Sequence, residues 1–530
     1  MHSEARRTIR PRAYVIFFLI FGVVVFASHG AFLALPYFWD EAGQFIPAAL
    51  DILRGGWFIP HSIAPNVHPP LVMAYLAGAW KTFGYSPETT RCAMLLLAAL
   101  GALTAFLLSI ELSREARGSP ALLAAGMLCV SPLFVAQSML AQLDAPAMLF
   151  TAWALLLFLQ DRIALSAAVC VGLVLVKETG VVVPVVFALW LSKERRWRDA
   201  TAFLAPAATL AFWLIALKFR TGSWAGNTEF VQYNLYYPLN PLRLLAALLR
   251  RIYYLLCADL HWVGALSICY AWRRSRLFYS RSWQIAWLLA VAHVAMFTVV
   301  GGAVLERYLV PVLPILYAGI AAALTVYSRW ARIASTVALL VGLAAGNFIN
   351  PPYPFPYENN LALVDFITLH RYAADLVYSR YPGARVDTMW PMTVELADPD
   401  LGYVRKAVPA IVLPELTAAN LERIDWSQAG VFIAFSRTWN PRHSVLNFPR
   451  FAALWERIYG EPRELSREQV RAHVPLPLRA QFDRRGQWVD IYVNPDWRPA
   501  GPYLKAIRER RLSFRAAGLE IHAGEAEILE

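Results

Sequence analysis

Two adjacent carboxylates, Asp40 and Glu41, follow the first long apolar run of the chain within the motif Pro36-Tyr37-Phe38-Trp39-Asp40-Glu41. A carboxylate at such a boundary can act as a general base, because burial and neighbouring charges adjust its pKa. Asp40 or Glu41 could therefore remove a proton from an acceptor hydroxyl. The structural alternative is that Asp40 caps the amphipathic helix that follows, with Glu41 in its first turn.

His68 and Asp144 also stand at ends of apolar segments. His68 precedes Pro69-Pro70, where a ring nitrogen could meet an anionic group, although a histidine at such a position is commonly a turn residue. Asp144 precedes Ala145-Pro146 and either caps the next apolar segment or projects into a polar cavity. Neither residue alone specifies a site.

The remaining candidates interrupt or open apolar segments. Lys177 and Glu178 lie in a run that is otherwise apolar from Ala164 to Leu191. They either face protein, as ionisable groups within a membrane usually do, or pair with each other in a hairpin turn. Arg307 and Tyr308 open a later apolar segment. Arg307 could hold a phosphate through two parallel hydrogen bonds, or it could extend to the membrane interface.

The elements that must position these residues are membrane helices. The chain has 530 residues, of which 58% are hydrophobic and 16% charged, which is too apolar for an ordinary soluble protein. Apolar runs long enough to cross roughly 30 Å of hydrocarbon recur from Ala13 to about Asn347. We therefore expect a polytopic α-helical membrane protein with about eleven transmembrane helices. The expected spans are 13–36, 91–112, 119–138, 145–160, 163–177, 179–192, 200–217, 247–271, 284–302, 308–327 and 333–349.

The distribution of basic residues predicts the orientation of these helices. Segment 68–83 is short for a span, so we expect it to lie along the interface or to re-enter. The basic loops after it, beginning with Arg114 and Arg117, then fall on the side of the N-terminal tail with Arg6, Arg7 and Arg10, as the positive-inside rule requires. This predicts a cytoplasmic N-terminus, and the basic flanks and lack of eukaryotic retention signals fit a bacterial inner membrane. The candidate residues and loop 37–90 would then lie near the outer surface.

Residues 350–530 are expected to form a soluble α/β domain on the periplasmic side, after a transmembrane domain of residues 1–349. A Pro-rich linker covers 351–356 and a helical pattern follows from Leu361 to Tyr381. Three short apolar stretches indicate buried strands. They are Ala384–Trp390, Gly430–Phe435 and Trp488–Val493.

The composition also limits the classes of partner and cofactor that the protein could bind. The formal net charge is +12, but the basic residues cluster in short loops, which indicates membrane topology rather than a nucleic-acid partner. The five cysteines fall in or beside apolar segments and imply neither a disulfide framework nor a thiolate metal site. The carboxylates could hold a divalent metal ion, although no spacing demands one. No cofactor is predicted with certainty.

As a set, the candidate motifs resemble the GT-C glycosyltransferases, in particular the branch of the protein O-mannosyltransferases and lipid A aminoarabinose transferases. The resemblance covers roughly residues 13–349. Its motifs are the acidic Trp39-Asp40-Glu41, the basic His68-Pro69-Pro70, Asp144, and Arg307-Tyr308 with the Pro-spaced helix start to Pro314. Many relatives have Lys where this chain has His68.

The resemblance implies that Asp40 is the catalytic base and that nearby cations bind a polyprenyl-phosphate-linked sugar donor at the periplasmic face. The sugar would pass to a hydroxyl of a lipid, glycan or protein acceptor. We expect Glu41, His68, Asp144, Lys177, Glu178, Arg307 and Tyr308 to bind substrate.

Two other functions fit many membrane spans with a few charges. A transporter or flippase of lipid-linked sugars would tend to place its charges near the bilayer midplane, in Gly- or Pro-broken helices of repeated halves. A membrane-anchored receptor or assembly protein would use its soluble domain, and the acidic residues would only cap helices. Here the charges gather at helix ends on one predicted face, which favours the enzyme.

Overall fold

The computed structural model describes residues 11–114, 120–302, 304–352, 357–439, 448–459, 464–498 and 526–527. The tail residues Arg6, Arg7 and Arg10, Arg117 of a basic loop, and residues 353–356 of the predicted linker lie outside these ranges. Within the chain, contacts define two compact units. Unit 1 comprises Met1–Leu33 and Pro47–Ile349, and unit 2 comprises Ala34–Ile46 and Asn350–Glu530. Residues 37–46, which we expected to belong with the membrane region, are thus grouped with unit 2.

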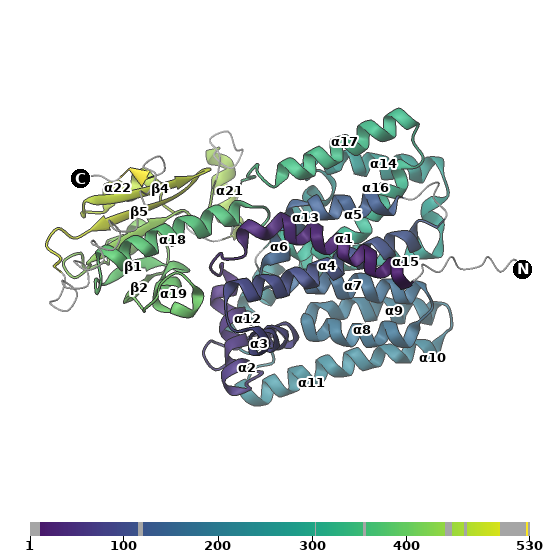
Figure 1. Ribbon diagram of the computed structural model, residues 1–530, viewed down its shortest axis with the longest axis horizontal. Coiled ribbons are helices and arrows are strands. Elements are labelled where there is room, and N and C mark those ends of the chain that lie inside the picture. Colours follow the sequence, from purple (N-terminus) through teal and green to yellow (C-terminus); the bar gives the residue numbers. More distant parts are fainter. Residues whose placement is uncertain are drawn as a thin grey trace, which may run out of the picture. The chain divides into compact units, whose positions relative to one another are not determined.

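Unit 1 is a bundle of helices (Figure 1). Its first helices are α1 (Pro11–His29), α2 (Ile46–Gly55), α3 (Leu71–Phe83), α4 (Pro87–Leu112), α5 (Ala121–Val130), α6 (Pro132–Met139), α7 (Asp144–Leu159), α8 (Ile163–Val176) and α9 (Val182–Lys193). The later ones are α10 (Trp197–Ala200), α11 (Leu204–Thr221), α12 (Thr228–Val231), α13 (Pro241–Leu256), α14 (His261–Arg274), α15 (Arg281–Val299), α16 (Leu313–Leu324) and α17 (Arg329–Gly346).

Several of these helices have the length and apolar character of membrane spans. In the part of the chain that the structure describes, five stretches are long and apolar enough to cross a membrane, and the number rises to seven if each of two bent pairs counts as one span. Every predicted span overlaps a helix, but α7 and α8 are shorter apolar helices. The polytopic helical membrane fold is therefore confirmed, whereas the predicted number of eleven spans is not.

The two bent pairs have local causes. α5 and α6 meet at 65°, because Ser131 is extended and Pro132 opens the next helix, so that the ladder of hydrogen bonds restarts. α13 and α14 meet at 47°, where Asp259 and Leu260 adopt left-handed backbone angles that no continuous helix contains.

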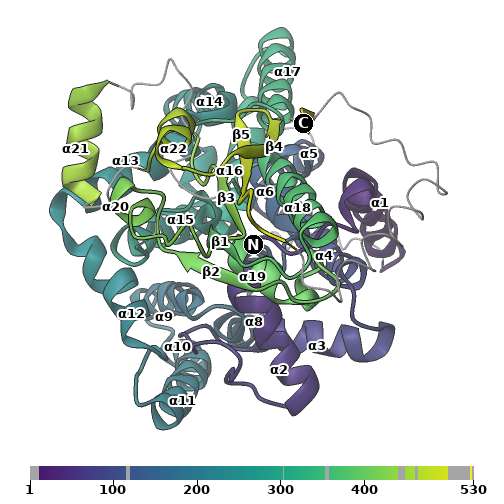
Figure 2. The same ribbon diagram turned by 90° about the vertical axis from the view of Figure 1, so that its left-hand side faces the viewer.

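Unit 2 is built on a six-stranded sheet of order β2-β1-β3-β5-β4-β6 (Figure 2). β1, β2 and β3 are parallel, and β5, β4 and β6 continue the sheet antiparallel. The strands are β1 (Val386–Met389), β2 (Ala410–Leu413), β3 (Val431–Phe435), β4 (Leu478–Arg484), β5 (Gln487–Val493) and β6 (Ala526–Glu527). The helices are α18 (Ala362–Arg380), α19 (Met392–Ala397), α20 (Ala418–Leu421), α21 (Pro449–Tyr459) and α22 (Arg467–His473).

The predicted elements of unit 2 are confirmed where the sequence is most apolar. The helical pattern from Leu361 to Tyr381 forms α18, and the three apolar stretches form β1, β3 and β5. Every residue of β1 and β3 is buried, and β3 is the continuous apolar run that a covered strand should be. α18 packs against β4 and β5.

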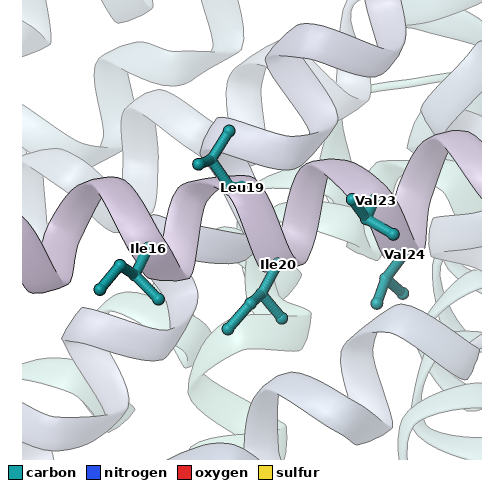
Figure 3. Close-up of a pocket in the computed structure, with 5 residues that line it drawn as sticks. All are labelled: Ile16, Leu19, Ile20, Val23 and Val24. Carbon is teal, nitrogen blue, oxygen red and sulfur yellow. The ribbon is translucent and has the colours of Figure 1, made fainter.

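A shallow apolar hollow of 360 Å³ runs along the exposed side of α1 (Figure 3). Its lining residues are Ile16, Leu19, Ile20, Val23 and Val24. All five are large hydrophobic side chains exposed at the surface, and they carry no group that could perform chemistry. The hollow fits lipid chains rather than a reaction site.

Candidate functional site

Three buried charged residues of unit 1 meet although they are far apart in the sequence. The Lys177 ammonium lies 2.6 Å from one carboxylate oxygen of Asp144, and Nε of Arg307 lies 3.5 Å from the other. The side chains are only 7%, 4% and 7% exposed, respectively. One carboxylate thus faces two cations inside protein, where the local dielectric constant is low.

Helix ends bring this charged cluster together. Asp144 is the first residue of α7, and the N-cap position is Leu143, which has no capping side chain. Lys177 follows the last residue of α8, and Arg307 lies in the 3₁₀ turn Glu306–Val312 that leads into α16. α7 packs against both α8 and this turn. The Asp144 carboxylate therefore faces the two cations of the cluster instead of capping α7.

Aromatic rings cover the Lys177 ammonium. Its Nζ lies 4.5 Å from the centre of the Tyr308 ring and 5.3 Å from that of Phe297. The two rings stack, with centroids 4.8 Å apart and planes 16° from parallel. The π faces attract the cation and replace part of its hydration, an interaction of about 2 kcal/mol or more in a desolvated setting. The rings and the Asp144 carboxylate together enclose the Lys177 ammonium.

His68 and Glu178 form a second ion pair in unit 1. Nδ1 of His68 lies 2.9 Å from Oε2 of Glu178, and each side chain is 16% exposed. Burial alone would raise the pKa of Glu178, but the charge and hydrogen bond of His68, and then the charge of Lys177, offset it and hold that pKa below its usual value. Lys177 and Glu178 consequently pair with different partners, so the simple hairpin pair considered from the sequence is wrong.

Further polar residues support the same region and were not among the predicted site residues. Arg250 forms an ion pair with Glu306, and Arg251, which is 2% exposed, donates from Nη2 to the Phe297 carbonyl at 2.6 Å. The ring of His293 hydrogen-bonds the Tyr308 carbonyl at 2.8 Å. The available signal was the pair of adjacent arginines in an amphipathic segment, since buried arginines need acceptors.

Gln142 also belongs to this part of unit 1, two residues before Asp144 in the bend between α6 and α7. Its side chain is buried, and its amide oxygen and nitrogen have no hydrogen-bond partner among the described residues. Such a group is costly to bury. The buried Gln142 amide adds a polar group to this bend that does not belong to the charged cluster.

The acidic pair Asp40 and Glu41 belongs to unit 2. Glu41 is fully buried, and its carboxylate accepts a hydrogen bond of 2.8 Å from the backbone N–H of Phe38. Asp40 occupies the N-cap position of the short π-helical turn Glu41–Phe45, but its side chain makes no capping hydrogen bond. The capping alternative for Asp40 is therefore wrong, and Glu41 is the residue that closes the turn.

An aromatic cluster holds the backbone next to Asp40. Trp39 has a φ of +46°, a left-handed angle that costs a bulky residue about 1–3 kcal/mol. Its ring makes edge contacts with Trp390 at 4.6 Å and with Phe366 at 5.8 Å between centroids. Two hydrogen bonds anchor Tyr37 in front of it, from its own N–H to the Leu401 carbonyl and from the Tyr403 hydroxyl to its carbonyl. These contacts fix the backbone conformation from which the Asp40 side chain projects.

The structure thus distributes the candidates over the two units. His68, Asp144, Lys177, Glu178, Arg307 and Tyr308 lie in unit 1, and Asp40 and Glu41 lie in unit 2. Among the described residues, no group of three or more His, Cys, Asp and Glu could hold a metal ion. The divalent ion considered from the sequence stays a prediction.

No family model and no curated protein matches the sequence, but solved structures share its fold. The crystal structure of ArnT from Cupriavidus metallidurans in the apo state is 13% identical and has a TM-score of 0.50, over 91% of this chain and 98% of that chain. The structure of the same protein bound to undecaprenyl phosphate is 14% identical with a TM-score of 0.50, over 92% and 100%. The archaeal oligosaccharyltransferase AglB from Archaeoglobus fulgidus is 11% identical with a TM-score of 0.49, over 92% and 75%.

The bundle of apolar helices followed by a small sheet domain is therefore a GT-C fold, the fold class of membrane glycosyltransferases. Within that class, the chain is similar in fold to ArnT, which represents the lipid A aminoarabinose transferase branch. The resemblance inferred from the sequence motifs is confirmed at the level of the fold.

Proposed function

We propose that this protein is a membrane glycosyltransferase that moves a sugar from a polyprenyl-phosphate donor to an acceptor hydroxyl. The observation that carries the proposal is the buried cluster of Asp144, Lys177 and Arg307. Two cations and one carboxylate lie in a low-dielectric setting, where positive groups attract an anionic ligand strongly. The ArnT structure of the same fold is bound to undecaprenyl phosphate, which is such an anion.

The phosphate of the donor would meet the cations of unit 1. Negative charge grows on the phosphate as the sugar departs, so a cation acts best when it is already in place and shielded from water. Lys177 is held by Asp144 and the Tyr308 ring, and Arg307 can offer a planar fork of donors. His68 would add a third positive group when protonated, with Glu178 keeping it oriented.

The acceptor would meet Asp40. In a single displacement, Asp40 takes the proton of the acceptor hydroxyl while the hydroxyl oxygen forms a bond to the anomeric carbon. The bond from that carbon to the phosphate oxygen breaks, and the lipid phosphate leaves with its electron pair. The left-handed Trp39 backbone and its ring contacts hold the base in one orientation, which such chemistry requires. Glu41 supports the same segment through the Phe38 N–H.

The proposed location is the bacterial inner membrane, with a cytoplasmic N-terminus and transfer at the periplasmic face. Residues 350–530 would then form the soluble domain beside the acceptor. A metal ion has no role in this scheme. Lipids, glycans and proteins all present hydroxyls that Asp40 could deprotonate, so the acceptor is left to experiment.

The test measures transfer of a radiolabelled sugar from polyprenyl phosphate to membrane acceptors by the full chain in proteoliposomes. The comparison is wild type against Asp40→Asn, with Asp425→Asn as a matched control, because Asp425 is an exposed carboxylate of unit 2. We expect transfer to fall at least about 100-fold in Asp40→Asn only, as for loss of a general base. Equal transfer in Asp40→Asn and wild type would remove Asp40 from catalysis. Donor movement between leaflets without sugar transfer would instead favour a flippase.

A further inference from the structure

One helix of unit 2, α21, exposes large apolar side chains that the rest of the unit buries. Phe448, which precedes the helix, is 60% exposed, and Phe451 and Leu454 on it are 53% and 47% exposed. By contrast, Phe366 and Phe435 elsewhere in unit 2 are each 1% exposed. α21 also stands apart from the sheet in the view of Figure 2. Its apolar surface is therefore available to something other than the core of unit 2.

The exposed residues of α21 follow a helical period. Phe451, Leu454, Trp455 and Ile458 are spaced i, i+3, i+4 and i+7, so they share one face. Trp455 and Ile458 are half-buried. The opposite face carries charged residues that are all exposed, namely Arg450, Glu456 and Arg457. α21 is thus amphipathic along its whole length.

Chain connectivity indicates which surface this face meets. The apolar stretch Arg12–Phe32 is a candidate membrane span, and unit 2 begins two residues after it, at Ala34. Unit 2 is joined to unit 1 again at Ile46–Pro47 and at Ile349–Asn350. These peptide bonds keep unit 2 within reach of a bilayer surface, which raises the effective concentration of lipid around α21.

The chemistry of α21 fits lipid headgroups better than it fits hydrocarbon or a protein core. Aromatic residues and arginines are the side chains that gather at membrane–water interfaces. Eleven residues give a helix of about 16 Å, too short to cross a bilayer but long enough to lie in its surface. Two arginines against one glutamate also complement anionic lipids.

We propose that α21 is an interfacial helix that inserts Phe451 and Leu454 into the headgroup region of the bilayer to which unit 2 is tethered. The arginines of its opposite face remain in water beside anionic headgroups. Two apolar side chains bind a membrane weakly when free, but the tether makes this binding intramolecular. The helix thereby fixes the height of unit 2 above the lipid. The inference does not depend on the proposed function.

The experiment places a photoreactive benzoylphenylalanine at Phe451 of the full chain in vesicles of phosphatidylcholine and phosphatidylglycerol. The matched control carries the same group at Ala453, which is exposed on the opposite face. We expect lipid adducts on the α21 peptide at position 451 to exceed those at 453 at least about fivefold. Adducts to protein, whether within the chain or in a second copy, would overturn the proposal, and so would equal or absent lipid labelling at both positions.

A second variant guards against an effect of misfolding. The double change Phe451→Ser and Leu454→Ser should leave the unfolding temperature in detergent within about 2 °C of wild type, because an exposed face contributes little packing. It should also lower lipid labelling by a photoprobe at Phe448 by about threefold or more. A fall of the unfolding temperature by more than about 4 °C would mean that this face packs on protein, which would overturn the proposal.

Discussion

Each unit contains a buried aspartate that faces two cations, but the two arrangements differ in exposure. In unit 2, Asp365 accepts hydrogen bonds from Nε of Arg484 at 3.0 Å and of Arg485 at 2.6 Å, and the arginines are 31% and 42% exposed. In unit 1, Lys177 and Arg307 face Asp144 and are each 7% exposed. Each cluster sets two cations against one aspartate, but the cations of unit 2 are exposed to water and those of unit 1 are buried.

This difference separates a structural clamp from a candidate binding site. Arg484 and Arg485 lie at the turn between β4 and β5, so water neutralises the charge that Asp365 does not, and the pair ties the turn to α18. Arg307 has little water and lies farther from its aspartate, at 3.5 Å. Excess positive charge in such a place is stable only when protein or ligand offsets it. Motifs of charged residues therefore become informative once the burial of each member is known.

The largest difference between the two units is expected when the second cation of each cluster is removed, Arg307 in unit 1 and Arg484 in unit 2. Arg307→Gln should lower sugar transfer at least about 100-fold, because it removes charge stabilisation from the leaving phosphate. Arg484→Gln should leave transfer within about twofold and lower stability by about 1 kcal/mol. Single-turnover transfer and thermal unfolding of both variants test this. Equal loss of transfer in the two variants would contradict the distinction.

The next test concerns the first cation of each cluster. Lys177→Met leaves Asp144 with one distant partner in a buried setting and should destabilise unit 1 by about 3–5 kcal/mol. Arg485→Met in unit 2 should cost about 1 kcal/mol, since water can reach Asp365 from the exposed side. Unfolding in detergent measures both. Adding Asp144→Asn to Lys177→Met should recover part of the stability without restoring transfer, and failure to recover any would argue against an uncompensated carboxylate.

A third prediction extends the comparison from charges to rings. Trp390→Ala removes the ring that holds Trp39 beside Asp40, so kcat should fall about tenfold while the KM for donor changes little. Phe297→Ala in unit 1 removes a ring beneath Lys177 and should raise the KM for donor instead. Steady-state kinetics of the two variants separate these effects. The reverse pattern would exchange the roles assigned to the two units.

The smallest expected effect is the pH dependence of two buried carboxylates. The pKa of Glu178 is held low, so its contribution to stability is present above its unfolded value of about 4.3 and is lost as pH falls through the lower folded value. Burial instead raises the pKa of Asp387 in unit 2, so its contribution is present below about pH 3.9 and is lost as pH rises.

Thermal unfolding between pH 3 and 6 therefore gives opposite slopes for these two groups. Glu178→Gln should flatten the rising part of the stability curve, and Asp387→Asn should flatten the falling part. Parallel changes in the two variants would show that neither pKa shift has the stated cause.

The sequence was sufficient where one local signal governs structure. Each predicted span became helix because apolar runs at that length have no other stable state in lipid, and β3 formed because its residues are apolar without interruption. β4 was missed because polar and charged residues interrupt it. β2 was missed although it is apolar, because four residues between two prolines give little signal. The bends of the helix pairs depend on packing and changed the number of full-length spans.

The sequence was sufficient to name the residues of the candidate site, but not to say which of them form ion pairs with each other. Charges at the ends of apolar helices must face protein, which is why Asp144, Lys177 and Arg307 could be named in advance. Which cation meets which carboxylate depends on contacts over long sequence separations, so Lys177 was first weighed as a partner of Glu178. The assignment of residues 34–46 to unit 2 likewise rests on contacts with Trp390, Leu401 and Tyr403.

Those contacts set an order of events for a growing chain. Tyr37 and its hydrogen-bond partner Tyr403 are separated by 366 residues. At a synthesis rate of roughly 5–20 residues per second, about 20–70 s pass before the partner exists. During that interval the ribosome has already delivered the apolar helices, while the acidic turn at Asp40 still lacks its scaffold. The protein therefore completes this turn only after the apolar helices have been made, and a chain cut at residue 349 would hold the helices without it.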